Sequence, residues 1–120
     1  MMSFEDINHR SSRRISLTVR EDSWYLNLSA FLRQELNFRE GDKIRVMQGR
    51  GDDTGKILLK KLHRSTHNAR VLSSTGRVEL GRNFIPPWMK RGNVKARGCE
   101  LLSVTKGTCV LSVPKDLRLC

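Results

Sequence analysis

Residues 26–36 read Leu-Asn-Leu-Ser-Ala-Phe-Leu-Arg-Gln-Glu-Leu, and this stretch decides the local fold. Its first three positions alternate apolar and polar, as in a strand, whereas Leu32 and Leu36 lie four apart, as on one face of a helix. Between them Ser29 can accept a bond from a free backbone N–H and cap the helix. Asn37 tolerates the left-handed conformation that ends a helix. We therefore predict a strand before Ser29 and a short helix after it.

The flanking sequence extends this pattern on both sides. Upstream, Ile15, Leu17 and Val19 alternate with polar residues, which predicts a half-buried strand. Downstream, the turn residues 40–42 precede two further expected strands, at 43–48 and 56–62, joined by the polar loop 49–55. Residues 15–62 therefore form one unit of two strands, a helix and a hairpin.

A second copy of this unit follows at an offset of 52 residues. Gly55-Lys56-Ile57-Leu58-Leu59 aligns with Gly107-Thr108-Cys109-Val110-Leu111, and Leu26-Asn27-Leu28 aligns with Val78-Glu79-Leu80. The alternative is two unrelated stretches of β pattern. The second copy predicts strands at 69–73, 77–80, 94–104 and 108–113, and a helical turn near 84–90.

These patterns divide the chain into five segments. We expect a basic N-terminal arm (1–14), a first repeat (15–62), a linker (63–68), a second and more basic repeat (69–115) and a C-terminal tail (116–120). A unit of about fifty residues buries too little apolar surface to be stable alone. The two copies must therefore pack together in one β-rich α+β body.

Three stretches of this sequence resemble the AbrB/MazE superfamily. They are residues 26–36, Arg39-Glu40-Gly41-Asp42-Lys43-Ile44-Arg45-Val46 and Gly55-Lys56-Ile57-Leu58-Leu59. The resemblance covers about fifty residues. It implies a swapped-hairpin barrel, with both halves in one chain as a pseudo-dimer, similar to the tandem MraZ subgroup. This sequence departs from the family pattern at the usual helix-initiating proline, which is Ser29 in the first copy and Gly81 in the second, and has Asn93 in place of the turn aspartate.

The resemblance also implies DNA binding through arginines of the first hairpin and the helix start. On this sequence those positions are Arg33 in the first copy and Arg77 and Arg82 in the second, while the outer strands add Arg14, Arg20 and Arg70. A guanidinium group donates in a planar fork to phosphate oxygens or to the edge of guanine. The alternative for each is a solvated surface arginine.

The charge of the chain favours a polyanionic partner. Its 23 Lys and Arg against 12 Asp and Glu give +11. The excess is uneven, because residues 21–62 carry 8 basic and 7 acidic side chains and residues 63–120 carry 11 and 3. We therefore expect the second copy to bind the polyanion and the first copy mainly to stabilise the fold.

Several other classes of protein lack support in the sequence. No apolar run is long enough to span a membrane and the N-terminus does not resemble a secretory signal, so we expect a cytoplasmic protein. Three cysteines without Cys-x-x-Cys spacing disfavour a disulfide framework or zinc site, and Cys99 and Cys109 are expected to be small buried residues. His63 and His67 are expected to lie in a polar linker, so we expect no metal site. The sequence has no nucleophile-elbow motif and no Gly-rich phosphate loop, so we expect no cofactor and no enzymatic activity.

The sequence thus predicts a sequence-specific double-stranded DNA-binding transcription regulator, either a monomeric pseudo-dimer or a homodimer. Two alternatives stay open. One is a protein-interaction module, such as an antitoxin or an inhibitor of a host enzyme. The other is a nonspecific nucleic-acid or RNA binder, in which Trp24, Phe84 and Trp88 would stack bases if exposed.

Overall fold

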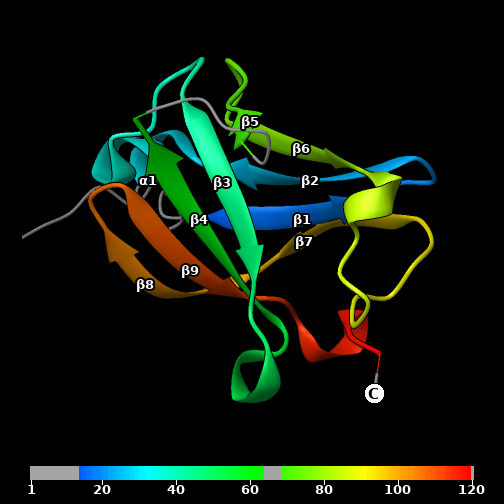
Figure 1. Ribbon diagram of the computed structural model, residues 1–120. Helices are drawn as coiled ribbons and strands as arrows, with labels where there is room; N and C mark the ends of the chain where they lie inside the picture. Colours follow the sequence, from blue (N-terminus) through cyan, green and yellow to red (C-terminus); the bar gives the residue numbers. More distant parts are fainter. Residues whose placement is uncertain (1–13, 64–68, 120) are drawn as a thin grey trace, which may run out of the picture.

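The computed structural model describes residues 14–63 and 69–119. This part of the chain forms a compact, β-rich domain with two antiparallel sheets and one α-helix (Figure 1). The β-rich α+β class expected from the sequence is therefore confirmed. Residues 1–13, nearly all of the expected N-terminal arm, and residues 64–68 of the expected linker lie outside the described residues.

Each sheet combines strands from both halves of the chain. Sheet A has the order β6 (Arg77–Gly81), β2 (Ser23–Leu28), β1 (Ile15–Val19) and β7 (Val94–Gly98). Sheet B has the order β5 (Ala69–Val71), β3 (Lys43–Gln48), β4 (Lys56–Leu62), β9 (Thr108–Ser112) and β8 (Glu100–Thr105). The two sheets do not close into a continuous barrel. The two halves of the chain therefore share both sheets, and the swapped-hairpin barrel implied by the resemblance is not confirmed.

The helix α1 (Ala30–Leu36) has the bounds and caps expected from its sequence. The Ser29 hydroxyl accepts a hydrogen bond from the backbone N–H of Leu32 at 3.4 Å. At the other end Asn37 has φ 59°, in the left-handed region, and its N–H bonds to the carbonyl of Gln34. The helix buries Leu32 and Leu36 against the core and thereby ties the two sheets to one apolar interior.

Two strand pairs bring together residues that lie 52 positions apart in the sequence, the offset expected between the two copies. In the β2–β6 pair Leu26 lies opposite Val78, its own counterpart in the second copy. In the β4–β9 pair Leu58 lies opposite Val110, again its own counterpart. Antiparallel strands that meet at equivalent residues are related by a local two-fold axis. Both sheets thus contain a pair with the register of a two-fold repeat.

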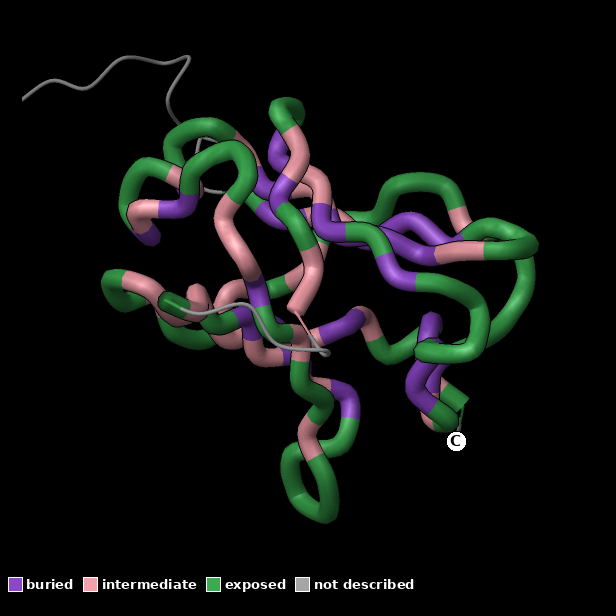
Figure 2. Tube along the Cα trace, turned by 45° about the horizontal axis from the view of Figure 1, so that its top comes forward, coloured by how far each residue is buried: buried purple, intermediate pink, exposed green. Residues whose placement is uncertain are grey.

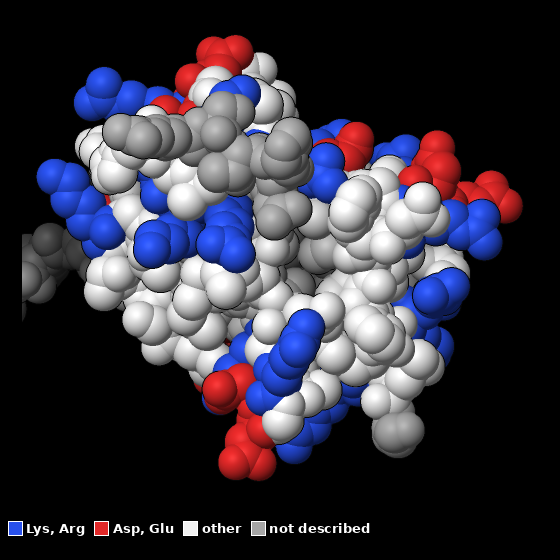
Figure 3. All heavy atoms as spheres, viewed as in Figure 1, with Lys and Arg blue, Asp and Glu red and all other residues white. Residues whose placement is uncertain are grey.

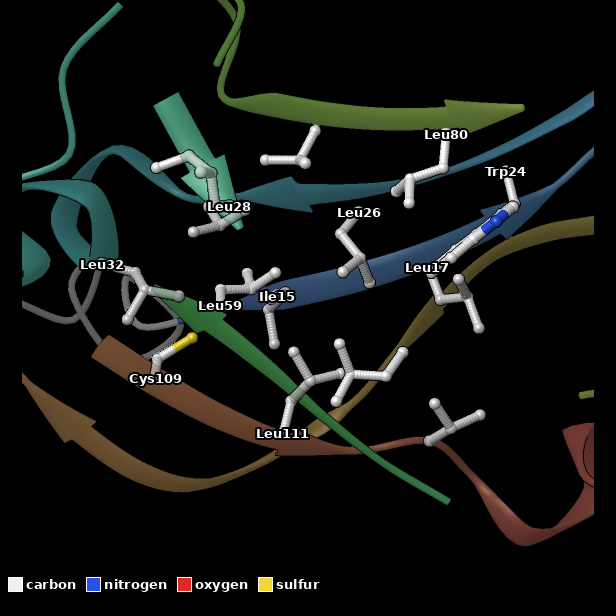
Figure 4. Packing of buried hydrophobic residues seen from close by; sticks show 14 of the residues in the cluster. Ile15, Leu17, Trp24, Leu26, Leu28, Leu32, Leu59, Leu80, Cys109 and Leu111 are labelled. Carbon is white, nitrogen blue, oxygen red and sulfur yellow. The ribbon is translucent and has the colours of Figure 1, made fainter. Parts of the chain in front are cut away.

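The core lies between the inner faces of the two sheets (Figure 4). Leu17 and Leu26 of sheet A and Leu59 and Leu111 of sheet B are all fully buried. Burial of such a side chain contributes roughly 1.5–3 kcal/mol relative to exposure. Because these side chains come from both halves of the chain, neither half can be removed without exposing the interior of the other.

Two expectations for the second copy are wrong. The helical turn near 84–90 is absent, and a single 3-10 turn, η3 (Arg82–Phe84), precedes the prolines. Pro86 and Pro87 bring no backbone N–H, so they cannot donate the bonds that would continue a helix. The strand expected at 94–104 is broken at Cys99, where the chain leaves sheet A as β7 and enters sheet B as β8.

Two peripheral segments complete the fold. The loop between β3 and β4, with the turn η2 (Gly51–Asp53), projects from the body as an exposed tip (Figure 2). The C-terminal segment contains the turn η4 (Lys115–Leu117) and is held in place, because Met89 bridges to Arg118 and the Arg118 guanidinium donates to Val113 O at 2.8 Å. The expected tail is therefore part of the folded body up to its last described residue.

Candidate nucleic-acid interface

A groove crosses the outer face of sheet A. Opposed pairs in the β1–β2 register, Ser16 with Asn27 and Thr18 with Tyr25, lie on the face turned away from the core because alternate strand residues point to opposite sides. Two hollows of about 560 and 520 Å³ adjoin over these pairs and share Asn27 and β7 as lining. We call this feature the sheet A groove.

Three of the six predicted arginines border the sheet A groove. Arg14 lines one end, where its backbone N–H bonds to the Ser29 hydroxyl at 3.0 Å, and Arg20 lines the other. Arg77, on β6, lies beside Tyr25 across the β2–β6 pair. Residues that are 63 positions apart in the sequence are thus placed around one surface feature.

Arg20 and Arg77 meet at the ring of Tyr25. The Arg77 guanidinium carbon lies 3.8 Å from the ring centroid, and the Arg20 guanidinium carbon lies 5.7 Å from it. Both distances are within the range of a cation–π contact. Arg20 also donates to the Tyr25 hydroxyl at 3.4 Å. The ring therefore orients two cations, one from each copy, and its own burial at 6% exposure excludes it as a base-stacking platform.

The electrostatics of this cluster show how closely its groups interact. Hydrogen bonds that the Tyr25 hydroxyl shares with the Thr18 side chain and with Arg20 lower the pKa of the phenol from its ordinary value, and burial only partly opposes this. Acidic side chains are also near, since Glu21 and Asp22 line the Arg20 end. The cations are thus placed on the rim and not along the whole groove.

Arg33 holds the two copies together instead of lining the groove. Its Nε donates to Leu28 O at 3.2 Å and a terminal nitrogen donates to Ser74 O at 3.5 Å. The guanidinium packs over Gly76, where a Cβ would lie 2.6 Å from Nε. This arginine is used to bridge α1 to the turn before β6.

Arg70 and Arg82 lie on a different part of the surface. Arg70, on β5, stacks on the exposed ring of Phe84 at 4.6 Å, and its buried Nε has no hydrogen-bond partner among the described residues. Arg82 is exposed in η3, two residues before Phe84. The structure thus places Arg14, Arg20 and Arg77 at the groove and Arg70 and Arg82 near Phe84.

The other aromatic candidates for base stacking are structural. Trp24 is 1% exposed and belongs to the core. Trp88 is half-buried against the core, and its indole N–H donates to the Gln48 side chain at 3.0 Å. Phe84 is 57% exposed, but the Arg70 stack covers one of its faces. These three aromatic residues therefore do not form a row of exposed rings on which the bases of a single strand could stack.

Two basic surface features were missed from the sequence. Lys95 lines the sheet A groove from β7, where the predicted sites included no residue. On sheet B, Arg45 lies directly opposite Lys60 in the β3–β4 register and both are exposed. The sequence did not indicate the Arg45–Lys60 pair, because the first copy has almost no net charge. A net charge does not show on which face of the sheet the acidic and basic side chains lie.

The described residues contain no group of three His, Cys, Asp or Glu side chains placed to hold a metal ion. Cys109 is buried, as expected, whereas Cys99 is half-buried where the chain passes between the sheets. Burial raises the pKa of the Cys109 thiol to about 12 and that of Cys99 to about 11. Both thiols are protonated at neutral pH and therefore have little nucleophilic character.

Comparisons with protein-family models, with curated proteins and with solved structures find no match for this chain. None of the helices in the described residues is long and apolar enough to cross a membrane.

Proposed function

We propose that this protein is a sequence-specific double-stranded DNA-binding transcription regulator, and that the sheet A groove is its DNA-binding surface. The observation that carries this proposal is the placement of Arg20 and Arg77 on the ring of Tyr25 at the rim of the groove. A guanidinium whose plane is fixed by stacking loses less conformational entropy when it donates to a phosphate or a base edge. The polar floor residues Ser16 and Asn27 supply further donors to the sugar-phosphate backbone.

The fold supports the proposal through its internal symmetry. The β2–β6 and β4–β9 pairs have the register of a local two-fold axis, as expected for a pseudo-dimer of swapped-hairpin units resembling the AbrB/MazE superfamily. A two-fold reader fits a pseudo-palindromic site, since the symmetry of the protein is then matched by that of the duplex. Tyr25 and Arg77 occupy equivalent positions in the two copies, so the arginine stack lies next to the axis.

The charge of the molecule supports the same partner. Neutralisation of phosphates releases counterions, and affinity then falls with salt with a slope of about 0.9 per phosphate contacted. The net charge of +11 provides this sequence-independent contribution. The oriented arginines would add the preference for particular base pairs.

A titration of a fluorescent duplex at several salt concentrations tests the proposal. Arg20→Gln/Arg77→Gln is compared with Arg50→Gln/Arg91→Gln, which removes the same charge from exposed arginines that do not line the groove. We expect the first variant to lower the slope of log K against log salt by about 2, and the control to retain most of it. Equal losses in the two variants would contradict the assignment of the groove.

In vitro selection of bound duplexes then separates specific from nonspecific binding. A recovered pseudo-palindromic motif is the expected outcome. Equal affinity for selected duplex, random duplex and RNA would show a nonspecific binder. A stoichiometric protein partner retained after nuclease treatment, with no duplex binding, would show a protein-interaction module.

A further inference from the structure

A second basic surface lies on the outer face of sheet B. Across the strands the register places Arg45 opposite Lys60, Lys60 opposite Thr108, and Thr108 opposite Thr105. We call these four residues the basic row. Arg45, Lys60 and Thr105 are exposed and Thr108 is half-buried. Two cations and two hydroxyl groups thus line up across four adjacent strands.

The basic row contains an unfavourable pair. Opposed side chains of antiparallel strands have Cβ atoms about 5 Å apart, and like charges at that spacing repel. The other two lysines of β4 each form an ion pair with an aspartate: Lys56 with Asp53 at 2.8 Å and Lys61 with Asp42 at 3.0 Å. Among the described residues, no carboxylate lies within ion-pair distance of Arg45 or Lys60.

The neighbouring rows of the sheet bring no compensation either. On one side lie Val71, Lys43 and Leu62, and on the other lie Met47, Leu58, Val110 and Ser103. None of these is acidic, and Lys43 adds a further cation. Figure 3, seen from the side on which β3 and β4 lie in front, shows two adjacent groups of Lys or Arg atoms left of centre without acidic atoms between them.

The two basic surfaces point in opposite directions. The single apolar core packs between the inner faces of the sheets, so the outer face of sheet A and the outer face of sheet B lie on opposite sides of the molecule. One duplex that occupies the sheet A groove therefore leaves the basic row free. A duplex carries about one negative charge per 1.7 Å of its axis, which suits closely spaced cations and hydroxyl donors.

We infer that the basic row binds the phosphate backbone of a second duplex, so that one molecule bridges two segments of double-stranded DNA. This inference rests on the proposed function of the sheet A groove. The groove contributes sequence preference through its oriented arginines. The basic row binds any duplex through its phosphates, because its side chains are not arranged to contact base edges.

A bridging assay tests the inference. A biotinylated duplex is held on beads, protein is added, and capture of a fluorescent second duplex is measured, while anisotropy reports binding to a single duplex. The variant Arg45→Gln/Lys60→Gln is compared with Arg20→Gln/Arg77→Gln and with the charge-matched control Arg50→Gln/Arg91→Gln. All six residues are charged side chains outside the apolar core, so we expect each variant to fold.

We expect Arg45→Gln/Lys60→Gln to bind a single duplex within about threefold of the unaltered protein and to capture at least about fivefold less of the second duplex, because two phosphate contacts are lost at one face only. Arg20→Gln/Arg77→Gln should lose second-duplex capture and keep only the weaker, salt-sensitive single-duplex binding that the basic row provides, and the control should keep both signals.

Four outcomes would overturn the inference. Capture that is unchanged in Arg45→Gln/Lys60→Gln excludes the basic row, and single-duplex binding without any second capture by the unaltered protein excludes bridging while leaving the sheet A groove intact. If capture follows the fraction of dimer in light scattering, self-association links the duplexes instead. If no duplex binds at all, and an acidic polypeptide such as polyglutamate binds in a way that Arg45→Gln/Lys60→Gln abolishes, the row serves a protein and the proposed function fails separately.

Discussion

Replacement of Gly76 by alanine should be among the most damaging single-methyl changes in this chain. Gly76 has φ +83°, and a Cβ there would lie 2.5 Å from the backbone oxygen of Leu28 and 2.6 Å from Arg33 Nε. The left-handed conformation costs an alanine about 1–2 kcal/mol. The arginine can swing away, but it then leaves Leu28 O, and a hydrogen bond from a charged donor contributes about 1.5–3 kcal/mol.

The backbone oxygen of Leu28 has no such freedom. Leu28 N donates to Gly76 O at 2.8 Å, so a shift that relieves the clash weakens this bond as well, at about 0.5–1.5 kcal/mol. We therefore expect Gly76→Ala to lower the free energy of unfolding by roughly 3–6 kcal/mol, measured by urea denaturation followed by circular dichroism.

Gly41→Ala is the matched control for this change. Gly41 has φ +87°, nearly the same as Gly76, but a Cβ there would meet no heavy atom within 4 Å. Gly41→Ala should therefore lower the free energy of unfolding only by the cost of the left-handed conformation for an alanine, about 1–2 kcal/mol. Equal destabilisation by the two substitutions would refute the view that the close approach of the two copies at Gly76, and not its backbone conformation, sets the cost.

Two further changes test the electrostatics of the fold. Burial alone would raise the pKa of Asp42, but bonds from the Arg39 backbone N–H and from Lys61 outweigh it and hold the pKa below its ordinary value of 3.8. A depressed pKa adds stability above the unfolded value that is lost as pH falls through the folded one. Asp42→Asn should thus cost about 1–2 kcal/mol at pH 7 and progressively less below about pH 4, and a pH-independent difference in urea midpoints would contradict this. Lys60→Glu should raise the free energy of unfolding by roughly 0.2–1 kcal/mol, because it replaces a like-charge pair with an attractive one, while it weakens second-duplex capture. An unchanged or lower melting temperature for Lys60→Glu would show that Arg45 and Lys60 do not repel in the folded chain.

The first copy was predictable because its local signals agree with one another. Ser29, the spacing of Leu32 and Leu36, and Asn37 each favour the same helix, and the structure shows α1 with those caps. The strands at 43–48 and 56–62 were also predicted with their observed bounds. Such agreement between propensity, pattern and capping is what makes a segment readable from sequence.

The second copy was less predictable because tertiary contacts override its pattern. Alternation through 94–104 suggests one strand, but the backbone N–H of Cys99 bonds to Ile15 O at 2.9 Å and the chain turns from one sheet into the other at that point. The two prolines remove the helix that the repeat would otherwise supply. The break at Cys99 thus depends on a partner that is distant in the sequence, whereas the prolines act locally.

The candidate sites show the same division between local and distant information. The sequence could not show that Arg33 bridges α1 to the turn before β6 while Arg20 and Arg77 meet at Tyr25. Nor could it place Arg45 opposite Lys60, since that pairing depends on the register of the hairpin. Surface function here is set by cross-strand neighbours, which no single stretch of sequence contains.

The two-fold register of the backbone does not extend to the chemistry of the outer faces. At the offset of 52 residues the counterpart of Lys60 is Ser112, an uncharged residue, so the basic row has no equivalent generated by the repeat. The counterpart of Tyr25 is Arg77, so the sheet A groove gains its stacked pair only because the copies differ. A symmetric dimer of identical units would carry the same groups on both sides of its axis. With both copies in one chain, each position can change independently, and the same fold can present an oriented arginine cluster on one sheet and an uncompensated cationic row on the other.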